Sequence, residues 1–133
     1  MVSAAVRVPG IVNAWKAVEF LLDTGADETC VHPADAALRL GIPVPALADP
    51  QNTLWAGAKP IQAGGVGGSA LYYALPATYA FLDDQGAVQT VDDVIQVAML
   101  TATNRGLPSL MGRNILQRFI VTIDSRRQIV TLA

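Results

Sequence analysis

Short apolar runs, separated by glycine, proline and aspartate, make up most of this chain. The runs at residues 15–22, 71–75, 78–82 and 87–100 are rich in apolar, β-branched and aromatic residues, and turn residues bound them. Such runs are typical of β-strands. Residues 119–124 and 129–132 form one more pair of this kind around a turn at 125–128. The pattern therefore predicts a mainly β fold that ends in a hairpin.

The start of the chain predicts a hairpin whose second arm ends at Asp23. Pro9 and Gly10 interrupt the first apolar segment, and proline beside glycine inside a strand indicates a bulge or an edge-strand kink. We therefore expect the turn of this hairpin at Asn13 and Ala14, just before the strand at 15–22.

Two segments have helical features. Residues 32–41 contain Pro33 near their start, several alanines and Gly41 at the end, which suits a helix with proline in its first turn. Residues 114–118 predict a second short helix, and residues 30–31 predict a short strand. The segment 42–60 holds four prolines and predicts irregular structure, with a strand at 53–55 whose Trp55 packs in the interior.

The composition suits one domain that spans residues 1–133. Apolar residues make up 52%, charged residues 15%, and the net charge is −2, so no basic surface for nucleic acid is expected. No apolar run is long enough to span a membrane, and the N-terminus lacks the layout of a signal peptide. Cys30 is the single cysteine, which favours a reducing, cytoplasmic setting. The large apolar share also indicates some surface buried between subunits.

An aspartate at the end of an apolar strand is the first candidate for chemistry. Residues 20–27 read Phe-Leu-Leu-Asp-Thr-Gly-Ala-Asp, with Asp23 directly before Thr24 and Gly25. Aspartate is depleted in strands, and a turn is one explanation, because aspartate bonds to its own backbone and glycine accepts positive φ. A second stretch, residues 110–116, repeats the order of an apolar strand, a glycine (Gly112) and a short amphipathic segment. The repetition favours a functional role.

A third stretch, residues 64–68, is rich in glycine. Its spacing formally matches a dinucleotide-binding turn, but such a turn must be followed by a helix whose N-terminus faces the phosphates. Residues 71–76 are instead aromatic and end in proline, which indicates a strand. The stretch therefore predicts a hairpin with a glycine-rich tip that can approach a peptide closely.

Metal and cofactor chemistry has little support in the sequence. His32 is the sole histidine, which argues against a metal cluster and against a Ser-His-Asp triad, and we expect it on the surface near a helix start. The aspartate pairs at 83–84 and 92–93 lack EF-hand spacing, so we expect turn and solvent-facing roles for them. We expect no metal ion and no cofactor.

Taken in order, the three stretches resemble the retropepsin-like aspartic proteases, the family of the retroviral proteases. The family's apolar-apolar-Asp-Thr-Gly-Ala turn corresponds to residues 21–27, its glycine-rich flap tip to 64–68, and its late apolar-apolar-Gly-Arg-Asn segment to 110–114. The resemblance implies a closed retropepsin-like β-barrel with one or two short helices. The insertion at 42–60 departs from the compact viral enzymes, and the full C-terminal hairpin resembles that of the cellular and bacterial single-domain branch.

The resemblance also implies an aspartic endopeptidase that acts on a polypeptide substrate. In such enzymes two carboxylates share one proton, so that one activates water while the other protonates the amide. This chain has a single Asp-Thr-Gly, so the dyad requires Asp23 from each of two subunits of a homodimer. Thr24 would bond across the two-fold axis, and Gly25 would leave room for the substrate. Ala26, where pepsin-type sites often have serine, predicts a pH optimum nearer neutral than that of a gastric enzyme.

Further roles follow from the resemblance. Asp27 would meet the substrate backbone and pair with Arg113, and Gly112 and Asn114 would help to support the active-site loop. The remaining substrate-binding candidates are Ala26, Val31, Gly64, Gly65, Val66, Gly67 and Ile115. The glycine-rich residues would close over the substrate and exclude water. Apolar pockets around the valines and the isoleucine would favour hydrophobic side chains beside the scissile bond.

Two alternatives stay open at this point. One is a non-catalytic dimeric module of the same fold that grips extended peptides. The intact Asp-Thr-Gly argues against it, because a binding module has no need of two apposed carboxylates. The other is a protease domain released from a longer polypeptide.

Overall fold

The computed structural model describes residues 1–65, 68–83 and 85–133. Its strands are β1 Val2–Val8, β2 Val12–Leu22, β3 Cys30–Val31, β4 Lys59–Gly65, β5 Gly68–Leu82, β6 Val88–Ala98, β7 Leu110–Met111, β8 Val121–Asp124 and β9 Ile129–Leu132. Its helices are α1 Pro33–Leu38, α2 Val44–Ala48, the 3-10 turn η1 Thr53–Trp55 and α3 Arg113–Leu116. The prediction of a mainly β fold with short helices is confirmed.

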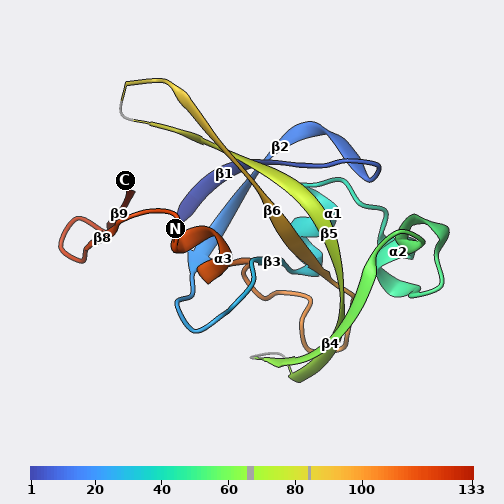
Figure 1. Cartoon of the computed structure of the whole chain (residues 1–133). Coiled ribbons are helices and arrows are strands. Elements are labelled where there is room, and N and C mark those ends of the chain that lie inside the picture. The colour runs from blue at the N-terminus through green and yellow to red at the C-terminus, as the bar shows by residue number, and fades with distance from the viewer. Residues whose placement is uncertain (66–67, 84) are drawn as a thin grey trace.

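Six of the described strands close into a barrel (Figure 1), in the order β1-β2-β7-β3-β6-β5 with a final pairing between β5 and β1. Strand β4 pairs with β5 outside this ring. The two-residue strand β7 lies between β2, with which it is parallel, and β3, with which it is antiparallel. Closure leaves few free strand edges. The expected closed barrel is therefore confirmed.

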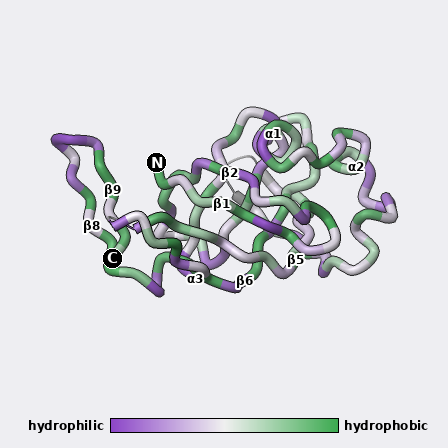
Figure 2. The backbone as a smooth tube through the Cα atoms, turned by 90° about the horizontal axis from the view of Figure 1, so that it is seen from above, coloured by the Kyte–Doolittle hydropathy of each residue, from purple (hydrophilic) through white to green (hydrophobic). Residues whose placement is uncertain are grey.

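The barrel interior is the hydrophobic core. Along β1 every second residue is buried, namely Val2, Ala4, Val6 and Val8, as expected when side chains alternate between the two faces of a strand. Figure 2 shows β1 and β5 in the body of the molecule, from which β8 and β9 project. Tyr79 is fully buried, and its hydroxyl donates to the carbonyl oxygen of Val94 at 2.9 Å. The interior thus tolerates a polar group only where a partner is supplied.

The N-terminal hairpin is present, but its turn lies earlier than expected. The turn is formed by Pro9, Gly10 and Ile11, with Gly10 at φ +82°. The Ile11 N–H donates to the carbonyl oxygen of Val8 at 3.0 Å. Proline cannot donate to a strand ladder and glycine readily adopts positive φ, so this pair reverses the chain instead of kinking it. Asn13, placed in the turn by the sequence, lies in β2.

Residues 42–60 are also more regular than expected. They hold α2 and, at 53–55, a 3-10 turn where the sequence predicted a strand. Asn52 explains the difference, because its side-chain oxygen accepts from the Leu54 N–H at 2.9 Å and so caps a helical turn. The predicted packing of Trp55 is confirmed: its ring stacks on Tyr73 at 5.1 Å, and its indole N–H donates to Ala46 O at 2.8 Å.

The helices are short. Helix α1 has 6 residues, begins at Pro33 as predicted and is followed by Gly41 at φ +76°. In the described part of the chain, no helix has the length and apolar character needed to cross a membrane.

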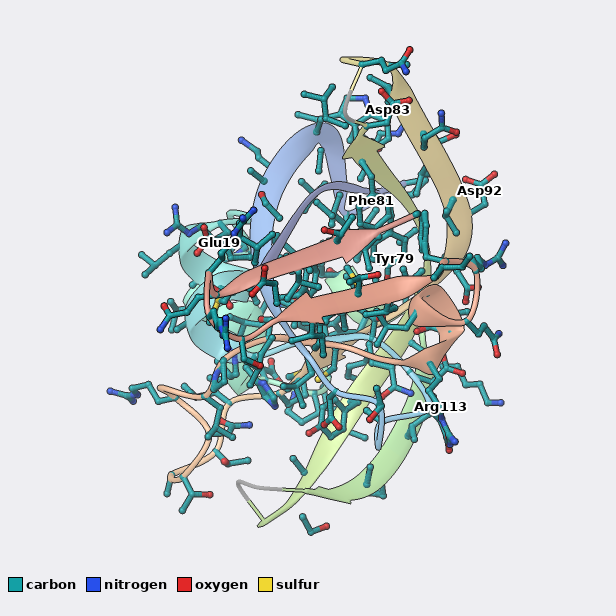
Figure 3. The ribbon with its side chains drawn as sticks, turned by 90° about the vertical axis from the view of Figure 1, so that its left-hand side faces the viewer. Glu19, Tyr79, Phe81, Asp83, Asp92 and Arg113 are labelled. Carbon is teal, nitrogen blue, oxygen red and sulfur yellow. The ribbon has the colours of Figure 1, made fainter. Side chains whose placement is uncertain are left out.

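The C-terminal hairpin of β8 and β9 confirms the predicted closing hairpin, and its residues Val121, Val130 and Leu132 pack against the barrel core. Its two strands pair with each other in a separate sheet. The hairpin projects from the side of the molecule where both termini lie (Figure 1) and faces the viewer in Figure 3.

Candidate active site

The fold brings the first and the third motif side by side. Strand β2 runs parallel to β7, with Leu21 opposite Leu110 and Leu22 opposite Met111. Directly after β2, the Asp23 N–H donates to the carbonyl oxygen of Met111 at 3.0 Å. The Asp-Thr-Gly turn therefore leaves the sheet next to the point where Gly112 leaves it.

The turn holds the Asp23 carboxylate with its own backbone. The Gly25 N–H donates to Asp23 Oδ1 at 2.9 Å, and the Ala26 N–H donates to Asp23 O at 3.2 Å. A Cβ atom at Gly25 would lie 3.2 Å from Asp23 Oδ1, tighter than most such contacts. Glycine thus keeps the space beside the carboxylate open, while Thr24 is exposed at the tip of the turn.

Gly112 is required by the close approach of the loop to α3. A Cβ atom at this position would lie 2.5 Å from Glu28 O and 2.9 Å from Ala26 O. Two N–H groups at the start of α3 bond to the same loop: Arg113 N–H donates to Ala26 O at 2.8 Å, and Asn114 N–H to Asp27 O at 3.0 Å. The first turn of a helix has unpaired N–H groups, and here the loop satisfies them.

A buried hydrogen-bond network reinforces this junction. Asn114 Oδ1 accepts from the Thr29 N–H at 2.9 Å and from the Thr29 hydroxyl at 2.8 Å. The Thr29 hydroxyl oxygen accepts from the Gly112 N–H at 3.0 Å. The Asn114 amide donates to Asp93 Oδ1 at 3.0 Å and to Val94 O at 3.1 Å. The network ties the loop, α3 and β6 together. Sequence reasoning missed Thr29, and it expected only a turn or solvent-facing role for Asp93, whose carboxylate instead bonds to Asn114 and Arg118.

The predicted ion pair between Asp27 and Arg113 is present. The Arg113 side chain is 57% exposed and the Asp27 side chain 79% exposed. Exposed pairs contribute little to stability, typically about 0–1 kcal/mol. The buried Thr29–Asn114 contacts, and not the ion pair, therefore fasten the loop.

A cavity of about 480 Å³ lies beside Asp23. Its lining comes from the Asp-Thr-Gly loop, from β3 and the residue after it, from the β4–β5 hairpin and from β6 and β7. The lining residues are Asp23, Gly25, Ala26, Asp27, Glu28, Cys30, His32, Ala63, Gly64, Tyr72, Gln96 and Leu110. The structure thus gathers Ala26, Asp27 and Gly64, three of the predicted substrate-binding residues, around Asp23. Gly65 ends β4, and Val66 and Gly67 lie outside the described residues.

Two predicted pocket residues do not line the cavity. Val31 and Ile115 are fully buried in the main core, and their assignment to a substrate pocket stays a prediction. Cys30 and Leu110 line it instead. Neighbouring residues of a strand point to opposite faces, so Val31 inside the barrel places Cys30 outside it. Strand alternation around residues 30–31 was the signal that could have identified Cys30.

His32 is also placed differently from the expectation. It is 4% exposed, not on the surface. Its Nδ1 lies 2.6 Å from the carbonyl oxygen of Pro108, and its backbone N–H donates to Ser109 Oγ at 3.1 Å. The ring meets the edge of Tyr72 and forms part of the cavity wall. Contacts with a segment 76 residues away in the chain bury it, which no local pattern indicates.

Burial changes the acidity of several groups around the cavity. It raises the pKa of the Cys30 thiol to about 11, so the thiol stays protonated at neutral pH. It also raises the pKa of the Glu28 carboxyl, and the nearby charges of Asp93 and Asp27 add to this shift. Burial acts on Asp93 in the same direction, but hydrogen bonds from Val94, Asn114 and Arg118 outweigh it and hold the pKa below its ordinary value. The ionised form is therefore disfavoured at Glu28, whereas hydrogen bonds stabilise it at Asp93.

Within the described ranges, no three His, Cys, Asp or Glu side chains are grouped as a metal site would need. The features of the cavity are therefore carboxylates, a small-residue loop and hydrogen-bonding side chains. Neither protein-family models nor curated proteins give a match to this chain.

Proposed function

We propose that this chain is a retropepsin-like aspartic endopeptidase that works as a homodimer. The observation that carries the proposal is the position of Asp23. It lies at the rim of a cavity large enough for a substrate side chain, and its loop is locked to the β7–α3 segment by buried hydrogen bonds. Catalytic groups need such rigid support, because small displacements are costly to rate.

The mechanism uses the two Asp23 carboxylates of the dimer, which share one proton. The charged carboxylate takes a proton from a water molecule as the water oxygen attacks the peptide carbonyl carbon. The protonated one gives its proton to the carbonyl oxygen, which yields a neutral tetrahedral diol. The carboxylate that is now charged takes one hydroxyl proton from the diol. The other carboxyl gives the amide nitrogen the proton that it took from water, and the C–N bond breaks. Two like charges at short distance cannot both ionise easily, so the pair is singly protonated over a broad pH range.

The exposed groups of the Asp-Thr-Gly loop support the proposal of a second subunit. Asp23 is partly exposed, and a single chain supplies one Asp-Thr-Gly carboxylate to the proposed dyad. Within the described residues, the exposed Thr24 hydroxyl has no hydrogen-bond partner. Both groups are therefore available to the equivalent loop of a second copy across a two-fold axis.

The C-terminal hairpin supports the same assembly. Ile120 is 73% exposed, Ile123 62% and Ile129 49%. Between the hairpin and the ends of β1 and β5 lies a hollow of about 580 Å³ lined in part by Phe81 and Phe119. A two-stranded hairpin is marginally stable alone, and apolar side chains at this density favour a partner surface. We assign this hairpin to the interface between subunits. The cytoplasmic setting stays a prediction from the sequence.

The test is cleavage of an unfolded protein between about pH 3 and pH 8, with wild type beside Asp23→Asn. Asparagine keeps the size and shape of the side chain but cannot take a proton from water. We expect the variant to lose at least about a hundredfold in rate, the scale of general acid–base catalysis. The dimer fraction of both proteins is measured by analytical ultracentrifugation, and it should be unchanged.

Each result bears on the proposal. Loss of cleavage in an Asp23→Asn protein that is still dimeric supports the dyad. Equal cleavage by both proteins contradicts it. Absence of cleavage by a folded, dimeric wild type at every pH overturns the enzyme assignment in favour of the peptide-binding module.

A further inference from the structure

The cavity has one polar wall, which is formed by the outer face of the barrel. Cys30 lies between Leu110 on β7 and Gln96 on β6 in the sheet, so these three side chains share a face. Two residues further along the chain, His32 follows on the same side, against the edge of Tyr72 from β5. All of them line the cavity that holds Asp23. The wall therefore offers a phenol, an imidazole and an amide to whatever the cavity binds.

These three polar groups keep free hydrogen-bonding capacity in the described structure. The His32 ring nitrogen Nδ1 faces a carbonyl oxygen at 2.6 Å, so it donates there, and Nε2 is the ring nitrogen left for a ligand. Among the described residues, neither Nε2, the Tyr72 hydroxyl nor the Gln96 side-chain amide has a partner. All three residues line the cavity, so each of these groups can hydrogen-bond to a polar ligand there.

Glu28 adds an independent and stronger signal. Its Oε2 atom is buried and has no hydrogen-bond partner in the described structure. The residue lines the same cavity. The rest of the side chain is half-buried. A buried carboxylate oxygen without a donor is unfavourable, and a ligand that donates a hydrogen bond to Glu28 would remove that cost.

The charges of the lining decide which donor fits best. The lining includes the carboxylates Asp23, Asp27 and Glu28, and its described residues include no lysine or arginine. Arg113 lies outside the lining and is already paired with Asp27. An ammonium or guanidinium group would therefore meet acceptors of opposite charge, whereas an apolar or acidic side chain would leave Glu28 without a partner.

We propose that Glu28, His32, Tyr72 and Gln96 form a subsite that selects a lysine or arginine side chain close to the scissile bond. Glu28 binds the cationic end, and the other three orient it. This inference rests on the proposed function and replaces the hydrophobic preference expected from the sequence. It names a substrate class: polypeptide segments with a basic residue beside the cleaved bond.

The test compares peptides that differ at one position only. Wild-type dimer is given a mixture of peptides with lysine, norleucine or glutamate in turn at each position around a mapped cleavage site, and products are quantified by mass spectrometry. Norleucine matches the lysine stem without its charge. We expect one position at which lysine is favoured over norleucine by about tenfold or more in kcat/KM.

Three variants assign the preference to residues. Glu28→Gln keeps the shape and removes the charge, so the lysine preference should fall towards unity. Tyr72→Phe removes a single hydroxyl and should lower it by a smaller factor. Glu19→Gln is the matched control: Glu19 is exposed, does not line the cavity and lies on the opposite side from Arg113 in Figure 3. It should keep the full preference.

The outcomes separate this inference from the proposed function. Efficient cleavage with norleucine equal to lysine at every position, or a Glu28→Gln protein with unchanged preference, would overturn the basic subsite and leave the protease intact. If wild type cleaves no peptide, the proposed function fails. The subsite is then judged by fluorescence anisotropy of the same labelled peptides. Tighter binding of a lysine peptide that depends on Glu28 supports it, and equal binding rejects it.

Discussion

At the scale of single residues, close packing and unmet polar groups determine how the site is built. Gly112 shows the first of these. The carbonyl groups of Ala26 and Glu28 occupy the space that a side chain would need, so the late motif requires glycine for steric reasons. The φ angle at Gly112 is −93°, so backbone conformation is not the cause.

Gly112→Ala should therefore destabilise the protein. The added Cβ would lie 2.5 Å from Glu28 O, and the backbone of the loop has to move to make room. We expect a loss of about 1–3 kcal/mol in the free energy of unfolding, the range for overpacked sites. Gly57→Ala is the control, because nothing lies within 4 Å of a Cβ there, and its effect should stay within about 0.5 kcal/mol. Urea denaturation of both variants measures the difference, and equal midpoints would contradict this account of Gly112.

Glu28→Gln should make stability less dependent on pH. The pKa of Glu28 is raised in the folded protein, so the folded state binds this proton more tightly than the unfolded state does. Stability of the wild type therefore falls as pH rises through the window above the ordinary glutamate pKa of about 4.3. Glutamine has no such penalty, so the variant should be the more stable protein at neutral pH and lose that advantage below about pH 4. Thermal unfolding at both pH values checks it, and a variant that is less stable at neutral pH would contradict the origin of the shift.

At the scale of elements, α3 holds the loop that carries Asp23 in place. Its N–H groups bond to loop carbonyls, and Asn114 reaches Thr29 on one side and β6 on the other. Arg118, just after the helix, pairs with Asp93 at 2.8 Å and extends the same connection. A helix of four residues would not be stable alone, so the contacts with loop and sheet hold it in place.

Asn114→Ala should therefore cost much more stability than Arg113→Gln. The alanine leaves the buried Thr29 N–H and hydroxyl without their acceptor, which costs about 1–3 kcal/mol. The glutamine removes an exposed ion pair, which costs less than about 1 kcal/mol. Urea denaturation ranks the two variants. The opposite ranking would mean that the ion pair, and not the buried network, fastens the loop.

At the scale of the whole molecule, the barrel and the projecting hairpin have different roles. The barrel fixes Asp23 and the cavity, while β8 and β9 present isoleucines that the rest of the described chain does not cover. If the hairpin is the interface between subunits, assembly and activity depend on protein concentration together.

Ile123→Lys should lower the dimer fraction and the cleavage rate in parallel. A lysine at the interface introduces a charge that loses its hydration on assembly. We expect dimerisation to weaken at least about tenfold, with activity partly restored at high protein concentration. Leu38→Lys is the control, since Leu38 is 83% exposed on α1 and far from the hairpin in the chain, and it should leave both quantities unchanged. Sedimentation and rate measured over a concentration series test this, and a monomer that cleaves at full rate would exclude the proposed assembly.

The sequence by itself determined the features that depend on local order. Strand runs, the helix after Pro33 and the closing hairpin follow from periodicity and turn residues, whereas the closed barrel was implied by the family resemblance that the three motifs carry. It misplaced the first turn and residues 53–55, where a Pro-Gly pair and the cap of Asn52 competed with apolar patterns.

Only the tertiary structure decided which side chains face the cavity. Thr29 and Asn114 are 85 residues apart, and His32 is buried by a carbonyl 76 residues away, so no local pattern brings them together. The choice between Cys30 and Val31 depends on which face of β3 lies inside the barrel. Barrel closure makes that choice, because it turns one face of every strand toward the core and leaves the other to form the site.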